Sequence, residues 1–341
     1  MKVLLTSVGR RAYMVKYFKK VLGTEGEVHV CNSDDKSIAF KYADRAFIAP
    51  LIYDDKYIPF LVDYCKKNEI SIVVSLFDMD LLILARNKEK FENNGTRVIV
   101  SDPKIIEICN DKWKTYQFLN ERGFYTPKTH LYLDEVINEL EQKRINYPII
   151  VKPRFGCGSI SVSIAYDEED LRYLAKKAQK EINNSYLKYE SAFTREKIIF
   201  QEKLSGQEYG ADIINNLQGN NINVVVRKKI AMRSGETDIA EIADIPIIKN
   251  ELKKLGTVTG HIANMDCDIF LVGDKPYILE MNARFGGGYP FSHMAGCNLP
   301  QAIVDWVAGK VIDVDLVSAQ VGIMGFKEIC ITDYVQNEKN Q

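Results

Sequence analysis

Glu280, Asn282 and Arg284 occupy alternate positions of the segment ILEMNAR (278–284). Successive side chains of a β-strand point to opposite faces, so these three would lie on one face. A carboxylate and an amide oxygen in this arrangement can both ligate one hard cation such as Mg2+, and the arginine could then meet phosphate oxygens. Taken alone, the segment is better explained as a half-exposed strand whose polar side chains face water.

Asp268 lies on the apolar segment that precedes this one, and the dipeptide Gly273-Asp274 between them is a turn signal. If the two segments pair as a hairpin, the carboxylate of Asp268 can join Glu280 and Asn282. The sequence therefore offers three oxygen ligands for a metal ion.

A lysine and two glycines stand together in KPRFGCGS (152–159), between two apolar runs. Glycine lets the backbone approach a phosphate and turn its N–H groups toward it, and Lys152 would add a point charge. Gly156, Gly158 and Ser159 are then candidate phosphate contacts. The spacing fits neither the P-loop nor the dinucleotide fingerprint, and an ordinary hairpin turn fits it equally well.

The segment FQEKLSGQE (200–208) ends an apolar run with charged residues. Backbone groups at Glu202, Lys203 and Leu204 could form an edge for a planar base, and Glu208 could take ribose hydroxyls. Taken alone, a strand end with solvated charges is the better explanation.

Short apolar runs alternate with helical patterns over the first hundred residues, which predicts a parallel sheet with helices on both faces. Ligands bind beyond the carboxyl ends of strands in such sheets. Three polar stretches would lie along that edge: Gly9 to Arg11, Asn32 to Asp35, and Asp78 to Asp80. Their simpler explanation is turn and helix-cap chemistry.

The rest of the chain is predicted to be α+β, with antiparallel hairpins. We expect an α/β domain over 1–105, a smaller unit with the glycine loop over 106–190, a strand-rich unit with the metal site over 191–330, and a polar tail over 331–341.

Composition excludes several classes of protein. The 341 residues carry a formal net charge of -1, which provides no broad basic field for nucleic acid or an anionic membrane. Seven cysteines and four histidines are scattered, so neither a disulfide framework nor a zinc site is indicated. Without a long apolar run or a signal-like start, a cytoplasmic protein is expected.

The order of these motifs, with Asp111-Lys112 before a helix, resembles the ATP-grasp superfamily over nearly the whole chain. The likeness is to the branch that includes the large chain of carbamoyl phosphate synthase, biotin carboxylase and stand-alone amino-acid ligases. It implies a Rossmann-like parallel domain followed by an ATP-grasp domain of two α+β subdomains. Departures are Ile160-Ser161 in the glycine loop and Ala283, where relatives often have glycine and proline.

The resemblance also implies roles. Lys112 and Lys152 would contact phosphates under the glycine loop, and the segment from Glu202 to Glu208 would hold adenosine. Asp268, Glu280 and Asn282 would carry Mg2+, for which Mn2+ could substitute, and Arg284 would steady the transferring phosphoryl group.

In ligases of this superfamily a carboxylate attacks the γ-phosphate of ATP, and an amine then displaces phosphate from the acyl phosphate. The expected partners are therefore a small carboxylate and a small amine, with a homodimer left open. Arg227 and Arg233, six residues apart on one strand, would share a face and are candidates for binding the carboxylate or acyl phosphate; surface arginines fit equally well.

Three alternatives stay open. A dehydrogenase is disfavoured because the first strand-to-helix turn, TSVGRR (6–11), has one glycine. A non-catalytic nucleotide sensor would not need the full metal set. An enzyme that forms a carboxyl or carbamoyl phosphate without an amine acceptor would use the same residues.

Overall fold

The structure is a computed structural model that describes residues 1–156 and 160–333. Its N-terminal domain is a sheet of five parallel strands in the order β3-β2-β1-β4-β5. The strands are β1 (Lys2–Thr6), β2 (Glu27–Asn32), β3 (Arg45–Ile48), β4 (Ile72–Ser75) and β5 (Arg97–Ile99). The helical elements are α1 (Ala12–Leu22), η1 (Ile38–Tyr42), α2 (Tyr57–Asn68), α3 (Asp78–Arg86) and α4 (Lys88–Glu92). The predicted parallel α/β domain is confirmed.

Alternation along β1 explains why both faces of this sheet are covered. Val3 and Leu5 pack on one side with Phe18 of α1, whereas Leu4 packs on the other side with Leu61 of α2. All are fully buried, as expected for a parallel strand with helices on both faces.

The small subdomain is a four-stranded antiparallel sheet in the order β6-β9-β7-β8. It contains β6 (Thr129–His130), α7 (Leu133–Glu141), β7 (Ile149–Pro153), β8 (Ser163–Ala165), α8 (Glu168–Asn183), α9 (Leu187–Glu190) and β9 (Ile198–Glu202). The expected boundary at 190 is therefore corrected. A third unit that begins at residue 191 would contain β9, but the backbone of β9 pairs with β6 and β7 of the small subdomain. This pairing joins distant segments, so it cannot be predicted from the local sequence.

The large subdomain is a six-stranded sheet in the order β14-β13-β10-β11-β12-β15, antiparallel throughout. It contains β10 (Gln207–Asn215), β11 (Asn221–Arg233), β12 (Glu236–Ala243), α10 (Pro246–Thr259), β13 (Ala263–Val272), β14 (Lys275–Asn282), α11 (Tyr289–Met294), α12 (Leu299–Val307), η2 (Val314–Val317) and β15 (Met324–Phe326). The sequence analysis missed β12, whose charged and small residues form no continuous apolar run.

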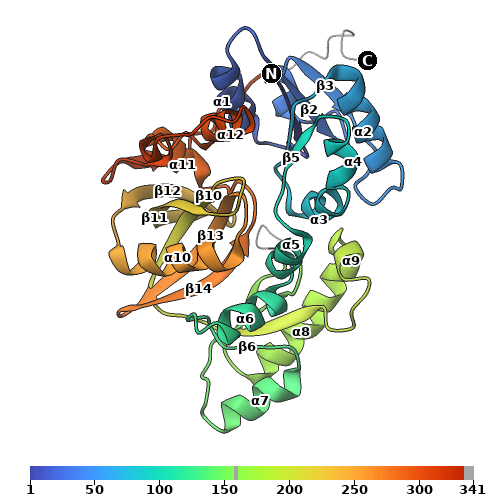
Figure 1. Ribbon diagram of the computed structural model, residues 1–341. Coiled ribbons are helices and arrows are strands. Elements are labelled where there is room, and N and C mark those ends of the chain that lie inside the picture. Colours follow the sequence, from blue (N-terminus) through green and yellow to red (C-terminus); the bar gives the residue numbers. More distant parts are fainter. Residues whose placement is uncertain (157–159, 334–341) are drawn as a thin grey trace.

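The N-terminal domain and the large subdomain are packed against each other. Ile106 of α5 (Pro103–Asn110) and Phe118 of α6 (Lys112–Glu121) join a hydrophobic cluster that also contains Leu4 and Met281. On the other side of the N-terminal sheet, α12 packs on α1 (Figure 1). The small subdomain, in green, has a hydrophobic cluster of its own. None of the described helices is both long and apolar enough to cross a membrane.

Candidate nucleotide and substrate site

A cavity of about 300 Å3 lies between the small and large subdomains. It brings together most of the residues singled out in the sequence: Lys112, Lys152, Gly156, Glu202, Lys203, Leu204, Glu208, Asp268 and Glu280. Gly158 and Ser159 lie outside the described residues. Lys152, Glu202, Glu208, Asp268 and Glu280 come from β7, β9, β10, β13 and β14, so the cavity exists only when the two sheets face each other. Lys112 begins α6.

The predicted hairpin is confirmed. β13 and β14 pair antiparallel around a turn in which Gly273 has φ +61°, and Asp268 stands directly opposite Glu280. Asn282 stands opposite Asp266. The tight turn and the register between the strands bring the carboxylates of Asp268 and Glu280 to this cavity, whereas Asn282 lines the adjoining one.

Lys229 of β11 is the main residue of this cavity that the sequence analysis did not single out. Its Nζ lies 2.6 Å from Oε1 of Glu208 and 2.6 Å from Oδ1 of Asp268. Burial disfavours its charged form, but the two carboxylates outweigh that effect and raise its pKa. The signal that could have identified Lys229 is its position two residues after Arg227 on the same strand.

The carboxylate of Glu280 is neutralised in the same way. Its Oε1 lies 3.2 Å from Nζ of Lys112. Burial alone would raise the pKa of Glu280, but Lys112 and Lys152 lower it below its ordinary value. Lys152 is itself 6% exposed, and burial is the main cause that lowers its pKa to about 8. In this site the lysines are paired with carboxylates. Binding of a nucleotide and a metal ion would separate these pairs, because the lysines would turn to the phosphates and the carboxylates to the metal ion.

The donor set suits magnesium, since Asp268, Glu280 and Asn282 offer oxygen atoms only. Within residues 1–156 and 160–333 no group of three or more His, Cys, Asp and Glu side chains is arranged to hold a metal by itself. Phosphate oxygens of a nucleotide would have to complete the coordination, which is the usual arrangement for Mg2+.

The opposite end of the cavity is suited to a planar base. Apolar side chains form its walls: Ile150, Val162, Leu204, Phe270 and Leu279. Gln201 of β9 is 3% exposed, and its Nε2 donates to Oγ1 of Thr129 at 2.8 Å. Its Oε1 is buried without a hydrogen-bond partner in the part of the chain that the structure describes. An amino group of a bound base could satisfy that acceptor.

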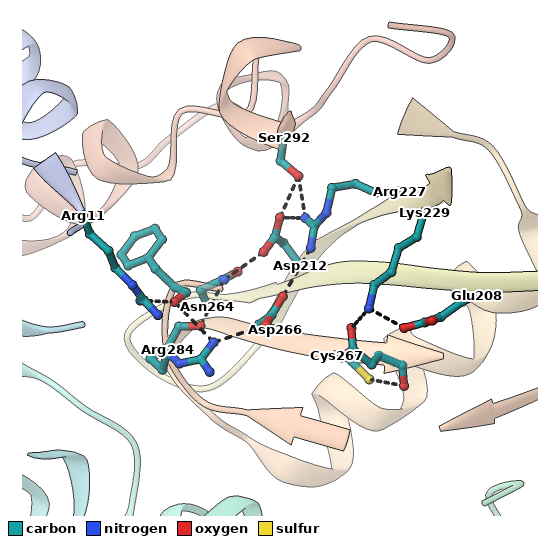
Figure 2. Close-up of polar contacts among 12 residues, drawn as sticks. Arg11, Glu208, Asp212, Arg227, Lys229, Asn264, Asp266, Cys267, Arg284 and Ser292 are labelled. Atoms are coloured by element: carbon teal, nitrogen blue, oxygen red, sulfur yellow. Dashed lines mark hydrogen bonds and ion pairs between the residues drawn. The ribbon is translucent and has the colours of Figure 1, made fainter. Parts of the chain in front are cut away.

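Arg284 belongs to a buried ionic network (Figure 2). Its Nε and Nη2 donate to Oδ2 of Asp78 at 3.1 and 3.0 Å, and its Nη1 lies 3.2 Å from Oδ2 of Asp266. Asp78 begins α3 in the N-terminal domain, 206 positions away in the chain. The pair therefore ties the large subdomain to the N-terminal domain.

Arg227 lies on the other side of Asp266. Its Nη1 donates to Oδ2 of Asp212 and, at 2.7 Å, to Oγ of Ser292, while its Nη2 lies 3.2 Å from Oδ1 of Asp266. Its side chain is 3% exposed and joins Asp212, Asp266 and Ser292 in one buried network.

Arg233 does not accompany Arg227, which corrects the expectation that the two share a face. The side chain of Arg233 is 61% exposed, pairs with Asp238 at 3.0 Å and lines neither this cavity nor the next one. The register of β11 shifts on both sides of Ala231, and such irregularities break the simple alternation of side chains.

A second cavity of about 660 Å3 adjoins the first. The two share Ile160, Lys229, Met232, Gly235, Asp268 and Glu280 as lining residues, and Asn282, Arg227 and Arg284 line the second. Arg10 and Arg11 also reach it, from the first strand-to-helix turn. Nη1 of Arg11 donates to the carbonyl of Phe285 at 2.7 Å.

The glycines after Arg284 are explained by packing against the network. A Cβ at Gly286 would lie 2.1 Å from the carboxyl carbon of Asp266, and a Cβ at Gly288 would lie 2.8 Å from Nη2 of Arg227. Both positions therefore require glycine for close approach rather than for flexibility.

Comparison with known proteins identifies the family of this fold. Residues 3–99 match the family described as PylC-like, N-terminal domain, and residues 109–288, more than half of the chain, match the ATP-grasp domain family. The chain belongs to the ATP-grasp family. The predicted class and fold, a Rossmann-like domain followed by an ATP-grasp domain, are confirmed.

Among curated relatives, the carbamoyl phosphate synthase large chain of Pseudomonas putida is 21% identical over 294 residues, 83% of this chain and 26% of that protein. The Clostridium beijerinckii large chain is 25% identical over 332 residues, 93% of this chain and 28% of that protein. The chain thus spans about a quarter of the length of these relatives.

Solved structures show the same fold. The biotin carboxylase domain of 2-oxoglutarate carboxylase from Hydrogenobacter thermophilus, solved with MgADP, aligns with a TM-score of 0.70 at 19% identity, over 91% of this chain and 70% of that one. The L-amino acid ligase from Bacillus licheniformis aligns with a TM-score of 0.68 at 18% identity, over 89% and 74%.

Proposed function

We propose that this protein is an ATP- and Mg2+-dependent ligase that activates a carboxylate as an acyl phosphate and couples it to an amine. One observation carries the proposal: the nucleotide cavity and the larger second cavity meet at Lys229, Asp268 and Glu280. A phosphate held at this junction faces a space large enough for two small substrates. Neither a nucleotide sensor nor a dehydrogenase needs such an arrangement.

In the proposed reaction a carboxylate oxygen of the first substrate attacks the γ-phosphorus of ATP, and ADP leaves. The amine of the second substrate then attacks the acyl carbon, and phosphate leaves. Lys112 and Lys152 neutralise the phosphates in place, which stabilises charge as it moves between the oxygens. Lys229 and Arg284, at the border with the second cavity, would hold the acyl phosphate.

The metal belongs to the same proposal. Asp268, Glu280 and Asn282 would hold Mg2+, or Mn2+ in its place, and the ion would supply further neutralisation of phosphate charge. Glu202 to Leu204 would hold the base through backbone groups and Glu208 the ribose, once Lys229 gives up its bond to Glu208. A reducing, cytoplasmic location is part of the proposal, supported by the six described cysteines, all of which are free thiols.

Release of ADP or phosphate with a panel of carboxylates and amines tests the proposal. Glu280→Gln should lower Mg2+-dependent turnover on the order of a hundredfold or more, because it removes one of two carboxylates at the junction. Glu89→Gln, an exposed glutamate on α4, is the matched control and should leave turnover unchanged. Equal activity of the two variants would mean that the metal is bound elsewhere. Turnover with a carboxylate but no amine would favour the alternative of an acyl- or carbamoyl-phosphate-forming enzyme.

A further inference from the structure

A third cavity of about 360 Å3 lies in the N-terminal domain, beyond the carboxyl ends of its strands. Its lining includes Asn32, the last residue of β2, together with Ala49 and Phe77, which come just after β3 and β4. Four residues line both this cavity and the second one: Ser7, Gly9, Phe77 and Tyr186. The two spaces are therefore neighbours across the first strand-to-helix turn, and we call the third one the N-terminal pocket.

The lining of the N-terminal pocket is mainly apolar and aromatic, with Ser7, Asn32 and Ser33 as its uncharged polar members. None of the described residues that line it carries a charged side chain. Tyr57 forms a fixed part of the wall, since it is 2% exposed and its hydroxyl donates to Oδ1 of Asp80 at 2.5 Å. Leu51 and Tyr53 remain 65% and 45% exposed at its rim. A hollow of this size and lining suits an uncharged group of a small molecule.

Another wall of the N-terminal pocket comes from the small subdomain. Tyr186, just before α9, packs edge-on against Phe77 with ring centroids 6.2 Å apart. Tyr53 donates to Oε1 of Glu190 at 2.7 Å and stacks on Tyr189 at a centroid distance of 4.8 Å. These contacts bring the segment around α9 of the small subdomain against the N-terminal pocket; Figure 1 shows α9 beside the N-terminal domain.

The turn between the N-terminal pocket and the second cavity has strained backbone. Ser7 has φ +52°, which is unfavourable for a residue other than glycine, and its hydroxyl is held by Oδ2 of Asp80 at 3.0 Å. Four residues later, Nη1 of Arg11 donates to the carbonyl of Phe285 at 2.7 Å, and Arg11 lines the second cavity. The turn thus presents a guanidinium to the second cavity beside the entrance to the pocket.

Charged side chains of both signs line the second cavity. Arg10 and Arg11 come from the turn beside the N-terminal pocket, where Arg10 lies 3.6 Å from Glu236. Asp268 and Glu280 lie at the junction with the first cavity, beside Lys229. A zwitterion could meet both kinds of charge here, with its carboxylate toward Arg11 and its amine toward that junction. Its side chain would then extend into a pocket without charges.

We propose that the N-terminal pocket binds the side chain of the amine substrate, and that this substrate is an amino acid with an apolar or aromatic side chain. This inference rests on the proposed function. Arg11 holds the carboxylate of the amino acid, and the pocket beyond Gly9 receives the side chain. The amine faces the junction of the two larger cavities, where the acyl phosphate would form.

Calorimetric binding of L-phenylalanine and L-alanine, with Mg2+ and a non-hydrolysable ATP analogue present, tests this inference. L-phenylalanine should bind roughly tenfold to hundredfold more tightly than L-alanine, the usual effect of burying a large side chain. Phenylethylamine, which lacks the carboxylate, should bind at least tenfold more weakly than L-phenylalanine.

Leu51→Asp places a charge at the rim of the pocket and should weaken L-phenylalanine binding at least tenfold. Ile48→Asp is the matched control, because Ile48 is also exposed, at 54%, but does not line the pocket. Ser33→Trp, at an exposed lining position, fills the pocket instead and should have the same effect as Leu51→Asp. Equal affinity for the two amino acids, or equal effects of Leu51→Asp and Ile48→Asp, would overturn the inference.

Binding of the ATP analogue without an amino acid is measured in the same series. If the analogue does not bind while L-phenylalanine binds and is lost in Leu51→Asp, the proposed function fails and the pocket stands. If the analogue binds and L-phenylalanine has no advantage over L-alanine, the pocket assignment fails and the proposed function stands.

Discussion

The protonation of Lys152 should control how nucleotide affinity changes with pH. Burial lowers the pKa of this lysine from 10.5 to about 8, which corresponds to about 3 kcal/mol at roughly 1.4 kcal/mol per pKa unit. A bound phosphate favours the charged lysine and raises its pKa again. Nucleotide then binds the protonated protein, so affinity falls as pH rises through 8. The dissociation constant at pH 9 should be about tenfold that at pH 7, because the protonated fraction of the free protein falls from about ten in eleven to about one in eleven.

Equilibrium binding of a fluorescent ATP analogue between pH 6.5 and 9.5 measures this effect. Lys152→Arg keeps its charge over the whole range, so its affinity should change less than twofold. The unliganded protein should show the opposite trend in stability. Its free energy of unfolding should rise between pH 8 and 10.5, because the unfolded chain there binds a proton that the folded chain does not. A flat binding profile for the wild-type protein would refute the assignment of Lys152 as a buried phosphate contact.

Three further predictions follow from the buried polar groups. Arg227→Met should lower the free energy of unfolding in urea by about 3–5 kcal/mol, because it leaves Asp212 buried without its partner; adding Asp212→Asn should restore part of it, and a loss below about 1 kcal/mol would contradict a structural role. Lys229→Met should lower kcat on the order of a hundredfold to a thousandfold while circular dichroism stays unchanged, and an undiminished kcat would remove Lys229 from the site. Burial lowers the pKa of His261 to about 4, so the protein should become less stable as pH falls from 6.5 toward 4. His261→Gln should flatten this pH dependence of stability in thermal melts. An equally steep fall in that variant would assign the pH dependence to other groups.

The hairpin of β13 and β14 could be predicted from sequence because it is local: the turn at Gly273-Asp274 is read directly, and Glu280 and Asn282 are two residues apart. Its exact register could not, because regular pairing from that turn would put Asp268 opposite Leu279, and the register shift between Asp268 and Ile269 puts it opposite Glu280 instead. The parallel sheet of the first hundred residues was predictable for a similar reason, since short apolar runs separated by helical patterns have few other solutions. The family resemblance rested on the order of such local motifs.

The tertiary structure decided everything that depends on pairing between distant segments. Arg284 meets Asp78 across 206 positions, and β9 joins the small sheet through partners that follow no local rule. The shifted register around Ala231 separates Arg227 from Arg233 although their spacing suggests one face. The same holds for Glu280 and Asn282: their positions on one strand follow from the sequence, and only folding brings Lys112 and Lys152 close enough to Glu280 to neutralise its charge. Alternation is a property of one strand, whereas burial and charge pairing are properties of the whole packed chain.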